Sequence, residues 1–159
     1  MSRRRRSGAV LAVAAVLGLT GCGGNATADD LAASRAAVIE AAQQDVPGIV
    51  EALGGEIQDS WGEWNSGGDG IVDRRRYAVT VVLTVGAVDA PAVVAAFEEA
   101  GWSDVAENSL DSIYGSRDDL EISTSTPTGS EMRIGVRGPY LEVADGVPRE
   151  AARQDVGLG

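Results

Sequence analysis

The stretch that decides the fold is Tyr77-Ala78-Val79-Thr80-Val81-Val82-Leu83-Thr84-Val85. Every second residue, beginning with the tyrosine, is large and apolar, and the residues between are alanine, threonine and valine. Neighbouring side chains of a β-strand point to opposite faces of the sheet, and β-branched and aromatic residues favour strands. Both rows of this segment tolerate burial, so the pattern predicts a strand at the centre of a sheet.

Two later segments predict a β-hairpin. Residues 120–125 and 132–137 each alternate an apolar row with a polar one. Pro127-Thr128-Gly129 fits a three-residue loop in which the glycine supplies the positive φ of a bulge. A one-residue slip of the pairing would bury a charged row, so parity limits the register. The expected cross-strand pairs are Ile122 with Ile134, Leu120 with Val136, and Asp119 with Arg137.

Three other segments carry weaker strand signals. Residues 56–64 alternate unevenly, and Gly62 predicts a bulge or an early end there. Residues 103–117 are polar and irregular, with one short strand expected near residues 110–114. Residues 140–143 are expected to add a short edge segment, because Gly138-Pro139 interrupts the ladder just before them.

A long helix is expected over residues 29–53, where apolar residues recur at three- and four-residue steps. Asp29 or Asp30 can cap its free amide groups. Pro47 lacks the amide hydrogen and crowds the preceding turn, so it predicts a kink or a restart, with Asp45 as a second cap. The glycine pair that follows the segment ends the helix.

A second, shorter helix follows the central strand. Asp89 provides a cap and Pro91 occupies the first turn, where its missing amide hydrogen costs nothing. Gly101 can take the left-handed conformation that ends a helix, and Trp102 can then pack back onto Phe97.

The order of these elements predicts an α+β fold. A helix, one or two strands, a second helix and then antiparallel strands favour a two-layer sandwich, with an antiparallel sheet and two helices on one face. We expect residues 29–143 to form this single domain. Residues 144–159 have almost no large apolar side chains, which predicts a mobile C-terminal tail.

The first residues of the chain have the pattern of a secretion signal. Four arginines, Arg3 to Arg6, precede an uncharged run from Ala9 to Leu19. Such a run is within the range of about 7–15 apolar residues of a signal peptide, and shorter than the roughly 20 needed to span a bilayer. Residues 1–21 are therefore predicted to be a signal peptide.

The signal peptide ends in Leu19-Thr20-Gly21-Cys22, which contains the only cysteine of the protein. Small residues before a cysteine resemble the lipobox of bacterial lipoproteins, in which the cysteine is acylated and the chain is cut just before it. Leu19, Gly21 and Cys22 match this pattern, and Thr20 stands where serine or alanine is commoner. Together with its richness in alanine, glycine, valine and arginine, the chain resembles the small lipoproteins of actinobacteria.

The resemblance implies a location and no activity. Cys22 would carry acyl chains that hold the protein on the outer leaflet of the plasma membrane, with residues 22–28 as a short tether. Ordinary secretory cleavage nearby is the alternative. A buried or disulfide-bonded Cys22 is disfavoured, because the chain has no second cysteine with which to form a bridge.

Charge and composition bound the possible partners. Of the 13 basic residues four leave with the signal peptide while all 24 acidic residues remain, so the formal charge of the mature chain is −15. Such a surface repels phosphate backbones, so no nucleic acid partner is expected. Arg74-Arg75-Arg76 is the one basic cluster of the mature sequence. Balance against nearby carboxylates is favoured for it over a binding patch.

The chemistry of the side chains argues against an enzyme. The chain has no histidine and no lysine, which removes the usual bases and nitrogen ligands. No catalytic, metal or cofactor residues are predicted. Adjacent carboxylates point in different directions on either a strand or a helix, so they make no obvious acid–base pair. They occur at Asp29-Asp30, Glu98-Glu99 and Asp118-Asp119.

Three functional hypotheses follow. The favoured one is a non-catalytic interaction or accessory module of the cell envelope, whose sheet or inter-layer groove contacts an unidentified envelope protein. The second is a small-ligand or lipid carrier, which requires an apolar cavity between helices and sheet. The third is a carboxylate-based hydrolase, which requires two acids about 5–10 Å apart in a cleft.

The lipid anchor is directly testable. Replacing Cys22 by alanine removes the thiol that is acylated, so we expect C22A protein to leave the membrane fraction while its domain folds as before. Mass spectrometry of the mature amino terminus should find the acyl adduct in the unaltered protein. Unchanged membrane retention of C22A, or a free thiol at the mature terminus, would contradict the anchor.

Overall fold

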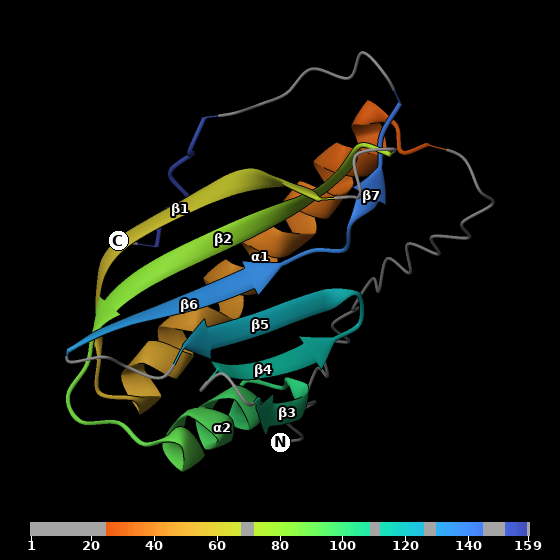
Figure 1. Ribbon diagram of the computed structural model, residues 1–159. Coiled ribbons are helices and arrows are strands. Elements are labelled where there is room, and N and C mark those ends of the chain that lie inside the picture. Colours follow the sequence, from red (N-terminus) through yellow and green to blue (C-terminus); the bar gives the residue numbers. More distant parts are fainter. Residues whose placement is uncertain (1–24, 68–71, 109–111, 126–129, 145–151, 159) are drawn as a thin grey trace, which may run out of the picture.

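The computed structural model describes residues 25–67, 72–108, 112–125, 130–144 and 152–158. Two helices lie on one face of an antiparallel sheet (Figure 1). This is the predicted α+β two-layer sandwich. The helices are α1 (Ala28–Ala52) and α2 (Ala90–Glu99). In the described part of the chain the strands are β1 (Glu56–Gly67), β2 (Arg74–Thr84), β3 (Ser103–Glu107), β4 (Ser112–Arg117), β5 (Leu120–Ser125), β6 (Glu131–Arg137) and β7 (Leu141–Glu142).

Several predictions concern residues outside these ranges. They are the signal peptide, the lipobox with Cys22, the first residues of the tether, the loop at residues 127–129, and residues 145–151 of the tail.

The central position predicted for β2 is confirmed. The strand order is β1-β2-β6-β5-β4-β3, and β7 pairs with the start of β2, beyond the end of β6. The large apolar row of β2 is 0–4% exposed and lies in one core cluster with side chains of both helices. Among those helix residues are Val38, Val46 and Ile49 of α1 and Phe97 of α2.

The start of α1 differs from the prediction, because its N-cap is Thr27 and neither Asp29 nor Asp30. The Thr27 hydroxyl accepts a hydrogen bond from the Asp30 amide at 3.2 Å, and the Asp30 carboxylate accepts from the Thr27 amide at 2.8 Å. This reciprocal pair is a capping box. The hydrogen bonds from the Thr27 backbone and hydroxyl lower the pKa of Asp30 below its ordinary value.

The tether ends earlier than predicted. Ala26 forms a parallel bridge with Val143, and its amide donates to the Glu142 carbonyl at 2.6 Å. The chain is therefore fixed to the sheet from Ala26 onward, two residues before the helix begins.

α1 runs through Pro47 without a restart, so the restart predicted there is wrong. The proline lies on the exposed side of the helix, where water can hydrate the carbonyl that has lost its partner. Asp45 is buried and caps nothing. Its carboxylate accepts from the Arg117 guanidinium of β4 at 2.6 Å, and that guanidinium also stacks on Trp102 with 4.6 Å between its carbon and the ring centre.

Both helices end as their glycines predict. At the end of α1, Gly54 has a φ of 63° and the Gly55 amide donates to the Val50 carbonyl at 2.9 Å. At the end of α2, Gly101 has a φ of 88° and the Trp102 amide donates to the Phe97 carbonyl at 3.1 Å. Both endings are Schellman motifs. The predicted Asp89 cap of α2 is also present, with the Ala92 amide 3.0 Å from its carboxylate.

The register of the β5–β6 hairpin is shifted by two residues from the prediction. The observed pairs are Ile122 with Val136, Thr124 with Ile134, and Glu121 with Arg137. A two-residue shift keeps every side chain on its predicted face of the sheet, so the parity argument is correct. The error lies in the assumed loop length.

Residues 103–117 contain two strands where one was predicted. β3 and β4 form an antiparallel pair with a register shift between Ser103 and Ala106, and Asp104 has a φ of 52°. β1 is also longer than predicted, and its irregularity lies between Ile57 and Asp59 rather than at Gly62.

The C-terminal segment is packed, which contradicts a mobile tail for residues 152–158. Gln154 exchanges two backbone hydrogen bonds with Gly62 of β1, at 2.8 and 2.9 Å, and the Gln43 side chain of α1 donates to the Val156 carbonyl at 2.7 Å. Val156 and Leu158 are buried in the main core cluster. Two apolar residues are thus enough to dock the segment between the edge of β1 and α1.

Gly62 is needed where β1 crosses Tyr77. A Cβ atom on Gly62 would lie 2.6 Å from the Cζ atom of the buried Tyr77 ring. The Tyr77 hydroxyl reaches past the glycine to donate to the Gln154 side chain at 3.3 Å, and the Trp64 ring meets the tyrosine edge-on at 5.2 Å. β1 therefore meets both the central strand β2 and the C-terminal segment at Gly62.

We expect Gly62→Ala to lower the free energy of unfolding by about 1–3 kcal/mol, because the new methyl group overlaps a ring that the core holds fixed. Gly48→Ala is the matched control, since a Cβ there meets nothing within 4 Å inside α1. It should stabilise the protein by roughly 0.5–1 kcal/mol. Urea unfolding of the mature protein measures both. Equal effects of the two substitutions would show that the Gly62 contact is unimportant.

Candidate functional site

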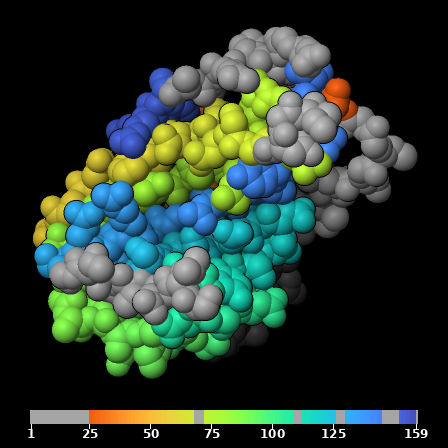
Figure 2. Space-filling model, viewed as in Figure 1, coloured from red at the N-terminus to blue at the C-terminus, as the bar shows by residue number. Residues whose placement is uncertain are grey.

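The face of the sheet opposite the helices is open to solvent (Figure 2). One row of residues crosses this face at matched register on five neighbouring strands. We call it the open-face row, and it consists of Trp61, Thr80, Gly135, Ser123 and Tyr114. Large aromatic side chains stand at its two ends, and small residues lie between them.

The open-face row lines a hollow of about 720 Å³. Adjacent strands lie about 4.8 Å apart, so the four strand intervals from Trp61 to Tyr114 cover roughly 19 Å. The hollow therefore reaches across all five strands.

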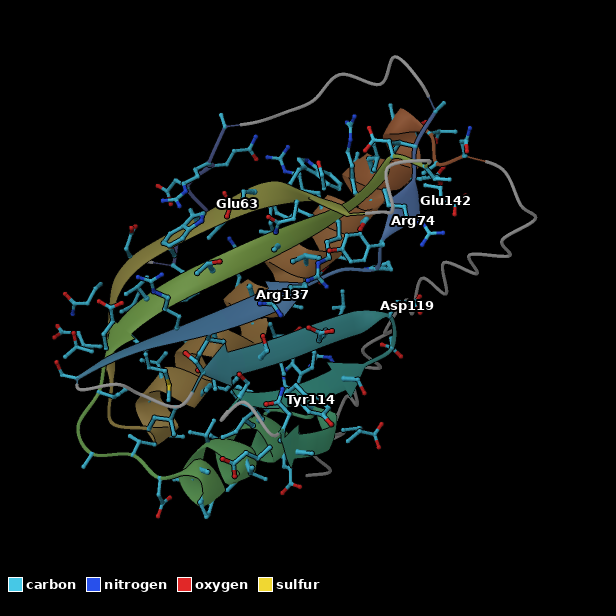
Figure 3. All side chains as sticks on the ribbon, viewed as in Figure 1. Glu63, Arg74, Tyr114, Asp119, Arg137 and Glu142 are labelled. Carbon is cyan, nitrogen blue, oxygen red and sulfur yellow. The ribbon has the colours of Figure 1, made fainter. Side chains whose placement is uncertain are left out.

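Arg137 lies at the centre of this hollow, between Glu63 and Tyr114 in the view of Figure 3. One Nη atom donates to the Ser123 hydroxyl at 2.8 Å and to the Glu121 carboxylate at 2.9 Å. The guanidinium passes over Gly135, where a Cβ atom would be 3.4 Å from its other Nη atom. That Nη atom and Nε have no hydrogen-bond partner among the described residues, so they can donate to a bound molecule.

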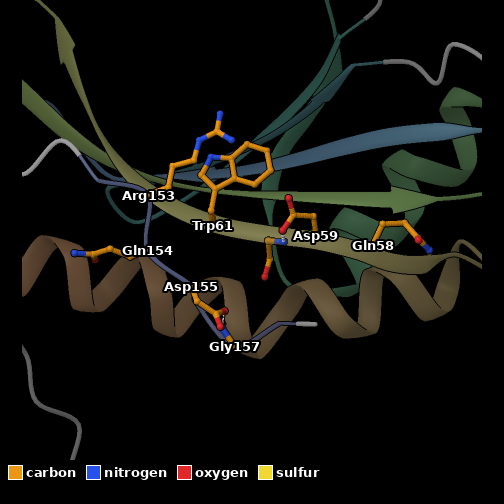
Figure 4. A pocket seen from close by; sticks show the side chains of 8 residues that line it. Gln58, Asp59, Trp61, Arg153, Gln154, Asp155 and Gly157 are labelled. Atoms are coloured by element: carbon orange, nitrogen blue, oxygen red, sulfur yellow. Dashed lines mark hydrogen bonds between the residues drawn. The ribbon is translucent and has the colours of Figure 1, made fainter.

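The Trp61 end is held by charged neighbours. The indole N–H donates to Glu63 at 3.3 Å, and the Arg153 guanidinium carbon lies 4.2 Å from the centre of the Trp61 ring. Figure 4 shows Arg153 over the indole, where the C-terminal segment passes β1. Trp61 and Arg153 also line a second hollow of about 500 Å³ between β1 and the C-terminal segment.

The Tyr114 end opens into a third hollow, of about 390 Å³. There the Arg76 guanidinium stacks on Tyr140, with 4.5 Å between its carbon and the ring centre. Among the described residues, Tyr114 and Tyr140 are the exposed large apolar side chains, at 42% and 45%. Both line hollows on the open face, which is a reason to look for binding here.

Each arginine that lines the main hollow pairs with a glutamate. Arg137 pairs with Glu121 at 2.9 Å, Arg133 with Glu131 at 3.0 Å, and Arg153 with Glu63 at 3.6 Å. The hollow therefore combines strong donors and acceptors without the net negative charge of the chain. Such a site suits a ligand that both donates and accepts hydrogen bonds.

The predicted balance of the arginine cluster holds for two of its three members. Arg74 pairs with Glu142 at 2.8 Å, and Arg75 pairs with Asp73 at 3.0 Å. The third member is Arg76, which stacks on Tyr140 at the open face. This third role was not predicted.

The carboxylate pairs singled out in the sequence lie at separate places. Asp30 belongs to the capping box of α1, Glu98 and Glu99 lie at the end of α2, and Asp118-Asp119 joins β4 to β5. Asp118 and Asp119 share the third hollow with Asp104 and Glu121. Among the described residues no group of three or more acidic, histidine or cysteine side chains is placed to hold a metal ion.

Sequence reasoning did not find the open-face row. Its members come from positions 61 to 135, and only the full strand order with the correct register brings them into line. The available signal was the run of small residues in the polar rows of three strands.

The chain matches no protein-family model, no curated protein and no solved structure. Neither helix of the described part has the length and hydropathy that crossing a membrane requires. The function is therefore inferred from the geometry of the protein itself.

Two arginine–carboxylate pairs of similar length should differ in their importance for folding. Arg137→Met should change the free energy of unfolding by less than about 1 kcal/mol, because its pair with Glu121 is exposed. Arg117→Met leaves Asp45 buried without its partner and should cost about 2–3 kcal/mol. Chemical denaturation of both variants gives the comparison. A large loss of stability for Arg137→Met would mean that this arginine serves the fold.

Proposed function

We propose that this protein is a non-catalytic binding module of the cell envelope, in which lipidated Cys22 holds the domain on the outer leaflet of the plasma membrane. The open face of the sheet binds its partner. The observation that carries this proposal is the open-face row, with exposed aromatic and charged side chains around a central hollow.

The composition of that face supports a binding role. An exposed tyrosine contributes little to stability, and exposed ion pairs contribute at most about 1 kcal/mol each. Arg137, Trp61 and Tyr114 nevertheless stand around one hollow with specific partners. Such side chains fit recognition better than folding. The absence of histidine and lysine from the sequence favours binding over catalysis.

The carrier alternative requires an apolar cavity between the layers. The space between the sheet and α1 is occupied by side chains such as Tyr77, Ile49 and Leu83, each at most 1% exposed. The hollows described above are lined by surface residues. A ligand on the open face therefore accords better with the geometry than a ligand between the layers.

Photocrosslinking in intact cells tests the binding face. We expect a photoreactive amino acid at position 114 to give a discrete adduct with an envelope component, because Tyr114 borders the hollow. The same group at Glu51, exposed on α1 on the other side of the sheet, is the matched control and should give little adduct. Adducts of equal yield at both positions, or none at position 114, would contradict the proposed function.

A further inference from the structure

We propose that the hollow on the open face binds an uncharged oligosaccharide, an inference that rests on the proposed binding function of this face. The sugar chain would lie along the open-face row, with ring faces against Trp61 and Tyr114 and hydroxyl groups against the polar centre.

The shape of the site fits a short chain of sugar rings. The hollow of about 720 Å³ is within the range of small-ligand sites, roughly 300–1,000 Å³. The open-face row that lines it spans roughly 19 Å across the strands, which exceeds what a single sugar ring occupies. Between the two aromatic ends the side chains of Thr80 and Ser123 are small and the Arg137 guanidinium covers Gly135, so a ligand there would lie on the guanidinium.

The two ends of the hollow suit the apolar faces of sugars. An aromatic ring carries negative charge on its face, which attracts the slightly positive C–H groups of a pyranose ring. Tyr114 is well exposed at one end. At the other end the Glu63 hydrogen bond and Arg153 hold Trp61 in place. The Arg153 guanidinium lies over one face of the indole, so a sugar ring would pack on the other face.

The centre of the hollow suits hydroxyl groups. A hydroxyl donates one hydrogen bond and accepts others, so it needs acceptors and donors side by side. Arg137 offers Nε and one Nη as donors, and the Glu121 carboxylate beside it is an acceptor. The Thr80 side chain lies on the same floor. Hydrogen bonds to charged groups such as these are stronger than those between neutral groups.

The balance of charge argues for an uncharged ligand. Each arginine of the hollow is paired with a glutamate, so an anionic chain would meet Glu121 and Glu63 as well as the acidic surface of the protein. A cationic chain would meet Arg133, Arg137 and Arg153. A neutral polyhydroxylated chain meets neither repulsion.

A peptide strand is disfavoured by its position on the sheet. Extended peptides usually add to a sheet edge, where free backbone groups pair with them. The open-face row crosses β2, β6 and β5, whose backbones are paired on both sides. The hollow therefore offers a ligand side chains and no free backbone groups. This arrangement suits a sugar chain better than a peptide strand.

Binding to an array of neutral and acidic oligosaccharides tests the inference, using the full lipidated protein in mild detergent. We expect binding to neutral chains of three or more sugars in preference to acidic ones. Tyr114→Ala and Gly135→Leu should each weaken that binding at least tenfold, the first by removing a ring face and the second by displacing the Arg137 guanidinium that lies over this glycine. Glu51→Gln on α1 is the control and should bind as the unaltered protein does.

Each outcome supports or overturns the oligosaccharide inference. If Gly135→Leu fails to fold, Tyr114→Ala still reports on the hollow, because Tyr114 is a surface residue. No binding to any neutral chain, or equal binding by the Tyr114→Ala protein, overturns the oligosaccharide inference. A protein adduct at position 114 in cells would then leave the proposed binding function standing with a different partner. Failure of both experiments removes both proposals.

Discussion

The two-residue period of β2 is the constraint on which the rest of the structure depends. β2 pairs with β1, β6 and β7. Its inward row of side chains, Tyr77 to Val85, therefore packs in the core between these strands and α1. The same period leaves small residues such as Ala78 and Thr80 on the outward row. Large residues inside and small ones outside follow from one alternation. The core and the hollow are therefore two sides of a single pattern, and a one-residue change of register would destroy both.

The arginine–carboxylate pairs divide between fold and surface according to burial. Asp45 and Arg117 join α1 to β4 and to the end of α2, where the guanidinium also stacks on Trp102. A buried charge that loses its partner is costly, so this pair holds the helices in one position relative to the sheet. The pair of Arg137 and Glu121 has a similar length, yet water screens it and its contribution to folding is small. This pair fixes the position of the Arg137 side chain while adding little to the free energy of unfolding, which is what a recognition surface needs.

Local rules predicted the parts of the fold that depend on a few neighbouring residues. The central strand, the Asp89 cap and the glycine endings of both helices were correct because each is set within one or two turns of chain. The C-terminal segment was missed because two buried residues, Val156 and Leu158, leave almost no periodic signal. The candidate site was not predicted because the hairpin register was wrong. The predicted hairpin register would place Ser123 opposite Arg133 instead of Gly135, so the row of small residues would not align.

The position of the hollow relative to the amino terminus completes the functional argument. Ala26 is bridged to Val143 beside the start of β2, and Cys22 lies four residues earlier, a reach of at most about 14 Å. Along β2, Thr80 lies six residues beyond Arg74, or roughly 20 Å farther from that corner. With Cys22 as the anchor, the hollow would stand within a few tens of ångströms of the bilayer. A partner for this face would then be a component fixed close to the outer leaflet, and a short tether would favour binding by holding the two at high local concentration.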